Sequence, residues 1–315
     1  MSGMRNEQSP RTPVLAINIP IYNRGDFLRR MLDRFSEDQD LFEEKVSLFI
    51  SDNCSEENLS AIVEEFCAKG LTVQYHRNDV NVGGDRNIIN CFRRMGGRYV
   101  WVLGSDDIPS PGCVREIVNL LESGEYGMLS LDNYSGQQGL HEYERLSDYL
   151  EHIYVWITFV SGNIVKAGFI PTVNLEAYMN TSISQVYLYL TASNRSACNA
   201  VYSRSYLDAG SDIENNGGYN PFEVFCEKLF AAFRQFEDEG VLSKQTFLAI
   251  KKKTYNLYIV KLIVDILIGG KNKGFKTENA WRILFKHYGT SFYAYVYLAK
   301  ELFCRALNKV KKCLL

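Results

Sequence analysis

Two adjacent carboxylates, Asp106 and Asp107, end an apolar run in the stretch "GRYVWVLGSDDIPSPG" at residues 97–112. Residues 99–103 have the length and composition of a buried strand, so the pair is expected at a sheet edge. Carboxylate oxygens suit Mg²⁺ or Mn²⁺, which would bridge them to phosphate oxygens and neutralise charge on a leaving group. The alternative is structural: one aspartate caps the helix expected after residues 109–111, and the other is solvated.

A glycine-rich loop is the second candidate for chemistry. In "NDVNVGGDRNIIN" (78–90), Gly83 and Gly84 permit close approach to the backbone, and Arg86 and Asn87 begin a predicted helix. A helix N-terminus with an arginine can bind an anion. Without further support, the same pattern describes an ordinary junction between a loop and a helix.

A third candidate is the pair Asp52–Asn53, which follows the apolar residues "LFI". An aspartate and an asparagine can accept from and donate to the edge of a nucleobase. The structural alternative is an Asx turn, or a cap on the helix expected near Ser55.

The elements that position these residues alternate regularly. Continuous apolar strands separated by helices indicate βαβ units and a mostly parallel sheet covered on both faces. Strands are predicted at 14–19, 46–50, 72–76, 99–103 and 126–131, and helices at 26–35, 57–70, 86–95 and 113–122. Ligands of such sheets bind beyond the carboxyl ends of the strands. The polar segments 20–26, 51–55 and 104–107 follow three strands, so they should converge on one crevice.

The rest of the chain is less regular. Residues 132–236 contain Gly- and Asn-rich breaks and predict mixed loops, short strands and helices that complete the site. From about 241 the pattern is helical. Near the C-terminus a predicted helix carries an apolar stripe at three- and four-residue spacing. Five cations lie on the same helix, with Glu301 as the one acidic residue among them. The stripe is Phe292, Tyr295, Ala299, Leu302 and Ala306, and the cations are Lys300, Arg305, Lys309, Lys311 and Lys312.

Composition excludes several classes. The 315 residues carry a net charge of -2, which gives no reason to expect nucleic acid as a partner. The eight cysteines form no CxxC pair and there are only four histidines, so a structural zinc site is not expected. This usage indicates a reduced, cytoplasmic chain. Residues 1–12 lack a signal-peptide core, and no segment is long and apolar enough to span a membrane.

Four segments in order carry a resemblance to a known family. They are "INIPIYNRGDFLRRML", "FISDNCSEENL", "HRNDVNVGGDRNIINCF" and "YVWVLGSDDIPSPG". Together they are similar to the donor-binding half of family 2 glycosyltransferases, most of all the bacterial abequosyltransferase-like enzymes. The resemblance covers about residues 13–131 and implies a GT-A fold, a nucleotide-diphosphate sugar donor and Mg²⁺ or Mn²⁺. The implied division is a domain at 13–236, with a donor half (13–131) and an acceptor half (132–236), and a helical region at 241–315.

The resemblance also implies roles for individual residues. The family's first nucleotide-contacting loop matches Pro20, Tyr22, Asn23 and Arg24. The acid that reads the base matches Asp52, which is followed by Asn53. The glycine loop contributes Gly84 and Arg86. Asp107 matches the metal ligand of the family's DxD element, and Asp106 matches the residue that contacts the ribose or a metal-bound water. Ser105 stands where DxD has its first acid, as in the abequosyl-like subgroup, which leaves fewer carboxylates for the cation.

The general base is the open part of the resemblance. Inverting members usually place an acidic pair on the acceptor side, but at the corresponding distance the segment 180–192 offers only Gln185, which cannot act as a base. Asp132, Glu176 and Glu223 remain as candidates. The alternative is retention of configuration, in which the leaving phosphate takes the proton.

The function predicted from these patterns is glycosyl transfer in bacterial surface-polysaccharide assembly, such as O-antigen or capsule. A hexosyl or deoxyhexosyl group would pass from a nucleotide-diphosphate sugar to a glycan acceptor, lipid-linked in similar enzymes. A nucleotidyltransferase on the same fold would open with a Gly- and Lys-rich phosphate loop, which "PIYNRGD" lacks. A catalytically inert glycan- or nucleotide-binding scaffold is the other alternative. The basic C-terminal helix predicts either peripheral binding to the anionic inner face of the membrane or packing on the catalytic domain.

Overall fold

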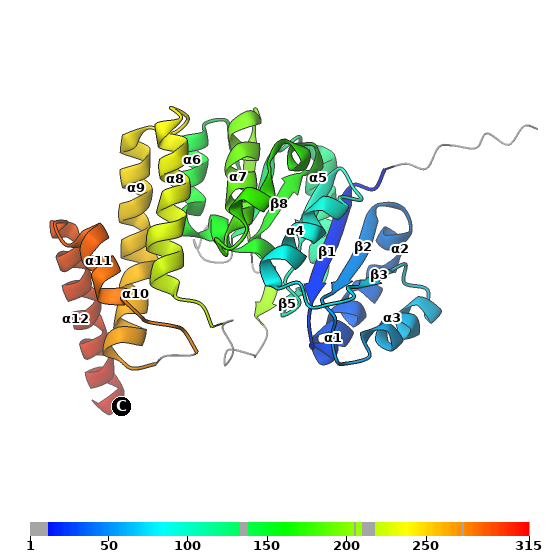
Figure 1. Ribbon diagram of the computed structural model, residues 1–315, viewed down its shortest axis with the longest axis horizontal. Coiled ribbons are helices and arrows are strands. Elements are labelled where there is room, and N and C mark those ends of the chain that lie inside the picture. Colours follow the sequence, from blue (N-terminus) through cyan, green and yellow to red (C-terminus); the bar gives the residue numbers. More distant parts are fainter. Residues whose placement is uncertain (1–11, 133–137, 205, 210–217, 272–273, 315) are drawn as a thin grey trace, which may run out of the picture.

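A computed structural model describes residues 12–132, 138–204, 206–209, 218–271 and 274–314 (Figure 1). Its centre is an eight-stranded sheet with the order β3-β2-β1-β4-β8-β6-β9-β7. The strands are β1 (Leu15–Ile21), β2 (Val46–Asp52), β3 (Gln74–Arg77), β4 (Tyr99–Val102), β6 (Met128–Asp132), β7 (Gly139–Tyr143), β8 (Asn163–Lys166) and β9 (Asn199–Ser203). A separate two-stranded ribbon pairs β5 (Asp107–Pro109) with β10 (Leu207–Ala209).

The helices of the donor half and its neighbours lie on both faces of the sheet. They are α1 (Gly25–Ser36), α2 (Gln39–Glu44), α3 (Leu59–Ala68), α4 (Gly84–Arg94), α5 (Cys113–Ser123), α6 (Leu146–Ile153) and α7 (Ser184–Arg195). The C-terminal helices are α8 (Leu229–Asp238), α9 (Lys244–Thr254), α10 (Val260–Leu262), α11 (Ala280–Tyr288) and α12 (Phe292–Leu314). The turns at Glu223–Lys228, Tyr255–Ile259 and Ile263–Ile268 are π-helical.

The predicted βαβ series and the mostly parallel sheet are confirmed. β1 pairs in parallel with β2 and with β4, and β2 pairs in parallel with β3. Two strands depart from this direction, because β8 is antiparallel to both β4 and β6, and β7 is antiparallel to β9. The prediction of mixed short elements after residue 132 is also confirmed.

Alternate residues of the central strands enter two different cores. On β4, Tyr99 and Trp101 pack with α1, α3 and α5, whereas Val100 and Val102 pack with α4, α6 and α7. This division follows from the period of two in a strand, and it explains why the strands read as unbroken apolar runs. The second core continues without interruption into the C-terminal helices, through Phe233, Ile250 and Ile283. The domain boundaries at residues 131 and 236–241 therefore stay predictions.

The C-terminal helix α12 packs through a different face from the predicted stripe. Ala294 is buried and Tyr293, Tyr297 and Leu298 pack against the core. The stripe residues face outward, with Phe292 81% exposed and Tyr295 55% exposed. The interpretation of this stripe as a packing face is therefore wrong, since the α12 side chains that reach the core lie beside it. Within the described residues, no helix is long and apolar enough to cross a membrane.

The structure also bears on the cations of α12 and on the cysteines. Arg305 is paired with Asp265 and Glu301, so it is not a free cation on the outer face of α12. The side chains of Lys311 and Lys312 lie outside the described part of the chain. The seven cysteines described, Cys54, Cys67, Cys91, Cys113, Cys198, Cys226 and Cys304, are free thiols.

Candidate functional site

Three polar loops meet at the carboxyl edge of the sheet, as the parallel strands predicted. β1 is the central strand, and β2 and β4 flank it. The backbone NH of Asn53, after β2, donates to the carbonyl of Ile21 at the end of β1 with an N···O distance of 2.8 Å. On the β4 side of β1, the Arg24 guanidinium lies 2.9 Å from Asp106 Oδ1. The predicted convergence of residues 20–26, 51–55 and 104–107 at one edge of the sheet is confirmed, and the crevice between them stays a prediction.

The Arg24 guanidinium compensates the first carboxylate of the pair. In addition to the ion pair with Asp106, Arg24 Nη1 donates to the Ser105 hydroxyl at 3.3 Å. The expectation that a metal and its diphosphate compensate both aspartates needs correction for Asp106, because a protein cation already does so. The helix-cap alternative is also wrong, since α5 begins after Gly112 and no side chain caps it.

Asp107 has a different environment from its neighbour. Burial raises its pKa to about 6, while a hydrogen bond from Ser161 lowers it and the charge of Asp106 raises it further. The Ser161 hydroxyl also accepts from the NH of Gly104 at 2.8 Å, which fixes its position. A Cβ on Gly104 would lie 2.9 Å from Asp107 Oδ2 and 3.3 Å from Asp106 Oδ1, so both carboxylates approach this glycine closely.

Sequence reasoning did not identify Ser161 as part of the site. Ser161 belongs to the segment 159–170, which follows α6 in the chain. The structure places the buried strand β8 there, and Ser161 precedes it with no exposed surface. No sequence signal could have found this contact, because Ser161 and Asp107 are far apart in the chain and meet only through the pairing of β8 with β4.

The two carboxylates fit a divalent metal that takes only one or two of its ligands from the protein. Among the described residues, no three His, Cys, Asp or Glu side chains cluster as a complete metal cage. Mg²⁺ typically needs only one or two carboxylates, with phosphate oxygens and water filling the other positions. Asp107, whose half-buried carboxyl makes no ion pair with a described cation, and Asp106 beside it have this donor set. Metal binding by Asp107 stays a prediction.

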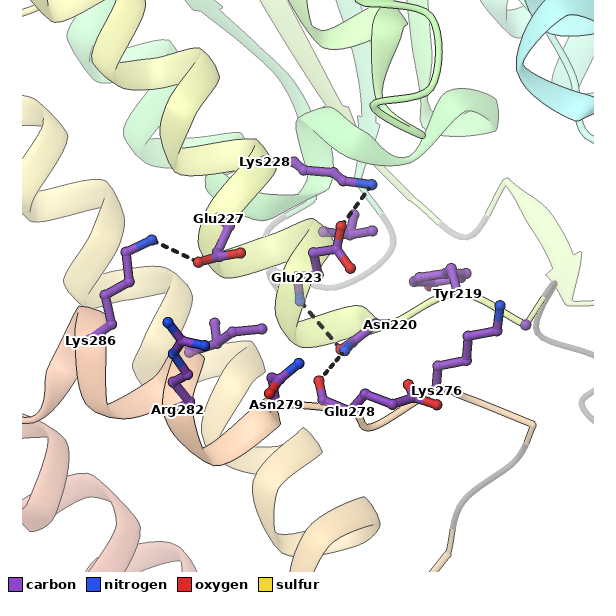
Figure 2. A pocket seen from close by; sticks show the side chains of 13 residues that line it. Tyr219, Asn220, Glu223, Glu227, Lys228, Lys276, Glu278, Asn279, Arg282 and Lys286 are labelled. Atoms are coloured by element: carbon purple, nitrogen blue, oxygen red, sulfur yellow. Dashed lines mark hydrogen bonds and ion pairs between the residues drawn. The ribbon is translucent and has the colours of Figure 1, made fainter.

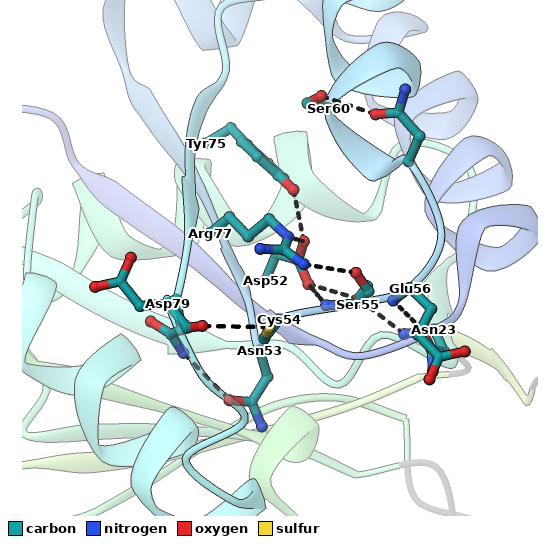
Figure 3. A network of polar contacts seen from close by, with 12 residues as sticks. Asn23, Asp52, Asn53, Cys54, Ser55, Glu56, Ser60, Tyr75, Arg77 and Asp79 are labelled. Atoms are coloured by element: carbon teal, nitrogen blue, oxygen red, sulfur yellow. Dashed lines mark hydrogen bonds and ion pairs between the residues drawn. The ribbon is translucent and has the colours of Figure 1, made fainter.

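Asp52 lies at the centre of a polar network (Figure 3). Its Oδ2 accepts from the Tyr75 hydroxyl at 2.6 Å, and its Oδ1 accepts from the NH and hydroxyl of Ser55 at 2.9 and 2.5 Å. The Arg77 Nε lies 3.6 Å from Oδ2. Burial and then Asp52 raise the pKa of Tyr75, so its hydroxyl stays a donor. Asp52 has no exposed surface, so this geometry shows the structural alternative, a turn closed on Ser55, while base reading stays a prediction.

Hydrogen bonds join the loop after β1 to the loop after β2. Asn23 has a left-handed backbone (φ 50°), and its Oδ1 accepts from the NH of Glu56 at 2.8 Å. The NH of Asn23 donates to the Ser55 hydroxyl at 3.0 Å. Pro20 is half-buried, and Tyr22 is 42% exposed and open to a ligand. The loop around residues 20–24 is thus fixed by residues that follow β2.

Asn53 positions the glycine loop instead of pointing to solvent. Its Oδ1 accepts from the NH of Val82 at 2.9 Å, and its amide donates to Asn81 at 2.9 Å. The loop then reaches Gly83 (φ 85°) and Gly84, and a Cβ at either glycine would meet open space. The space beside these glycines is therefore open at the N-terminus of α4, and anion binding by this loop stays a prediction.

Arg86 lies at this helix N-terminus and is 40% exposed. Its Nη1 is 3.3 Å from Glu176 Oε1, and Arg93 contacts the same oxygen at 2.7 Å. Asp85, one residue earlier, accepts from the NH groups of Asn180 and Ser182, both at 3.2 Å. The glycine loop is thereby attached to the acceptor-side segment around residue 180.

The three candidate bases occupy three different environments. Glu176 is engaged by Arg86 and Arg93. Glu223 lies in a charged cavity between the start of the α8 helix and α11, where Lys228 is 3.3 Å away (Figure 2). Asp132 ends β6 at the same edge of the sheet as Asp107, and it contacts His152 Nε2 at 3.3 Å. The structure therefore does not bring the three candidates together.

The sheet order, the position of the acidic pair and the loops at the carboxyl edge define a GT-A type glycosyltransferase fold. The crystal structure of S. aureus TarS 1–349 in complex with UDP-GlcNAc matches with a TM-score of 0.60 at 13% identity, covering 87% of this chain and 81% of that chain. The mannosyltransferase PcManGT from Pyrobaculum calidifontis, in complex with GDP-Man and Mn²⁺, matches with a TM-score of 0.53 at 14% identity, covering 94% and 82%. At these identities the likeness concerns the fold alone.

The chain belongs to glycosyl transferase family 2, whose sequence model matches residues 16–210. It is 32% identical over 111 residues to abequosyltransferase RfbV of Salmonella typhimurium, covering 35% of this chain and 33% of that protein. It is 28% identical over 120 residues to an uncharacterized glycosyltransferase of Mycoplasma pneumoniae, covering 38% and 40%. The matches span well under half the length of either relative.

Proposed function

We propose that this protein transfers a hexosyl or deoxyhexosyl group from a nucleotide-diphosphate sugar to a glycan acceptor during bacterial surface-polysaccharide assembly. The observation that carries the proposal is the convergence of Arg24, Asp106, Asp107 and the open N-terminus of α4 at one edge of the sheet. Family membership and the similarity to abequosyltransferase RfbV support it.

Different residues of the site would bind different parts of the donor. A bound Mg²⁺ or Mn²⁺ would supply charge stabilisation to the departing diphosphate, and Asp107, with Asp106 beside it, would hold that metal. Arg86 and the NH groups after Gly83 offer positive potential to a diphosphate at the start of α4. The Arg24 guanidinium, 2.9 Å from Asp106 Oδ1, holds that carboxylate in place. Tyr22 and the loop closed by Asp52 form the side on which the nucleoside would lie.

Asp132 is the candidate base that the geometry favours. Glu176 is held by two arginines and Glu223 lies in another cavity, whereas Asp132 lies at the catalytic edge of the sheet. His152 Nε2 contacts Asp132, and His152 Nδ1 is 2.5 Å from the Tyr143 hydroxyl. This chain of contacts would orient the imidazole toward the carboxylate. Asp132→Asn should then abolish transfer without weakening nucleotide binding; full activity of this variant would favour retention of configuration.

A nucleotide screen tests the proposal most directly. Thermal unfolding is measured with UDP, GDP, CDP or dTDP in the presence of Mn²⁺, since a ligand that binds only the folded state raises the midpoint. Hydrolysis of the matching sugar donor is then measured with the metal. Stabilisation together with hydrolysis supports an enzyme. Stabilisation without any hydrolysis or transfer supports the inert scaffold, and no stabilisation by any of the four contradicts the donor class.

We also propose that the outer face of α11 and α12 binds an anionic membrane surface. These helices lie at the end of the molecule opposite α3 (Figure 1). Large apolar side chains are exposed there, namely Trp281 (57%), Phe285 (74%), Phe292 (81%) and Phe303 (65%). Lys300 and Lys309 are exposed on the same helix as Phe303. An apolar face bordered by cations is typical of helices that lie in the membrane interface.

Vesicle sedimentation tests the membrane proposal. Each engaged cation contributes about 1 kcal/mol near an anionic surface, so binding should be reversible and weaken at high salt. Phe285→Ser with Phe292→Ser should reduce binding to phosphatidylglycerol vesicles and leave donor hydrolysis intact, because the donor residues lie elsewhere. Equal sedimentation with neutral and anionic vesicles, or none with either, would contradict the proposal.

A further inference from the structure

An aromatic cavity of about 240 Å³ is formed by segments between residues 155 and 258. Its walls include the rings of Trp156, Phe159, Tyr219, Phe225 and Tyr258. The Trp156 and Tyr258 rings have centroids 5.5 Å apart at an angle of 76°, and Phe225 and Tyr258 are 4.9 Å apart at 79°. Because these rings meet edge to face, the cavity is enclosed by aromatic surfaces in several orientations.

Two walls of this cavity are attached to the donor site. Phe159 is two residues before Ser161, which binds Asp107, so at most about 7 Å separates the Cα atoms of Phe159 and Ser161. Ser182, another lining residue, donates its NH to Asp85, the residue before Arg86. The cavity is therefore bordered by segments that contact both the acidic pair and the glycine loop.

Hydroxyl groups and an ordered backbone complete the cavity. Thr158 and Ser182 are among the lining residues, and the Thr158 hydroxyl donates to the Val155 carbonyl at 2.8 Å, which leaves its oxygen as an acceptor for a ligand. Gln185, which stands where similar enzymes carry an acid, donates through Nε2 to the carbonyl of Thr158 at 2.9 Å. The residue that could not serve as a base thus fixes the polar wall of the cavity.

We propose that this cavity binds a hexopyranose ring of the acceptor glycan, an inference that rests on the proposed function. A pyranose presents C–H groups on its faces and hydroxyls on its edge. Aromatic walls with a few placed polar groups match both features. A larger charged cavity of about 680 Å³ shares Tyr219 and Val224 with the aromatic one and contains Lys276 and Arg282 (Figure 2). This adjoining space accommodates the rest of a polar acceptor, which a hydrocarbon chain would not favour.

Saturation-transfer NMR with simple glycosides tests the assignment. The probes are the methyl glycosides of glucose, galactose, mannose and rhamnose, each added to the full chain with diamagnetic Mg²⁺ and the nucleotide diphosphate that stabilises it. At least one glycoside should receive saturation from the wild type. Trp156→Leu should weaken its binding at least tenfold. Trp281→Leu is the matched control, because this exposed tryptophan on α11 lies outside the cavity, and its variant should keep the signal.

A second variant keeps the test decisive if Trp156→Leu fails to fold. Thr158→Val preserves side-chain volume and removes the hydroxyl, and it should weaken glycoside binding several-fold. The proposal is overturned if no glycoside receives saturation from a wild type that binds the nucleotide, or if the signal survives in the folded cavity variants. Absence of nucleotide stabilisation in the wild type would instead contradict the proposed function, so the two failures are distinguishable.

Discussion

Replacement of Asp107 by Asn should stabilise the metal-free protein while abolishing transfer. Burial raises the Asp107 pKa from its ordinary 3.8 to about 6, so the ionised carboxylate is about 3 kcal/mol less favourable in the folded than in the unfolded chain. Asn has the same shape and can still accept the Ser161 hydrogen bond. Part of the gain is offset because the amide group needs a partner. A net gain of about 1–3 kcal/mol would raise the unfolding midpoint of a chain of this length by about 1.5–4.5 °C.

The pH dependence of this effect has a defined sign. Above about pH 6 the folded wild type carries the unfavourable charge, so the variant should be the more stable protein. As pH falls from 6 to below about 4, Asp107 becomes protonated in both states and the difference should vanish. Calorimetry in EDTA across this range measures both limits. Asp106→Asn is the matched control: it removes a partly exposed ion pair with Arg24, which offsets the relief of its repulsion with Asp107, so it should stabilise far less than Asp107→Asn.

With metal and nucleotide bound, the wild type should become more stable than the Asp107→Asn variant. A ligand at one hundred times its dissociation constant stabilises the folded state by about 2.7 kcal/mol. Mn²⁺ with the cognate nucleotide diphosphate should therefore stabilise the wild type and leave the Asp107→Asn variant almost unchanged. The reasoning is refuted if the variant is less stable than the wild type in EDTA at pH 8. It is equally refuted if the variant retains the full response to Mn²⁺ and near-normal turnover.

Three further outcomes are expected from other parts of the molecule. Arg86→Ala should weaken nucleotide binding by about 1.5–3 kcal/mol in calorimetry, whereas Arg93→Ala, which removes the other partner of the same glutamate, should leave it unchanged. Tyr75→Phe should lower the free energy of unfolding by about 1–3 kcal/mol in urea, because a buried oxygen of Asp52 loses its donor; an unchanged urea midpoint would contradict this. Burial lowers the pKa of His287 to about 4, so stability present above pH 6.5 should be lost as pH falls toward 4. The loss should be about 1–2 kcal/mol after allowance for its partial exposure, and His287→Asn should remove this dependence.

The relation between sequence and fold is clearest in the central strands. Residues 14–19, 46–50 and 99–103 could be recognised because a strand buried on both faces must be apolar at every position. The rule that parallel strands end at one edge then predicted that Asp52, Arg24 and Asp106 lie together at that edge. These inferences need only local composition and chain order, and the structure confirms the arrangement.

Other features depend on contacts between distant segments. Ser161 contacts Asp107 because β8 is inserted antiparallel between β4 and β6, and no local pattern specifies that insertion. Tyr75 donates to Asp52 Oδ2 from the neighbouring strand, so the tertiary structure makes Asp52 a buried anchor of its loop, while its role in base reading stays a prediction.

For this protein, the sequence alone determined the alternation of strands and helices, the edge at which chemistry is possible and the family resemblance, because each depends on side-chain type and local spacing. Tertiary structure decided which carboxylate Arg24 neutralises, which face of α12 is buried and which aromatic rings enclose a cavity. The physical reason is that charge compensation, burial and cavity shape depend on distances between side chains. Those distances exist only after segments far apart in the chain have packed together.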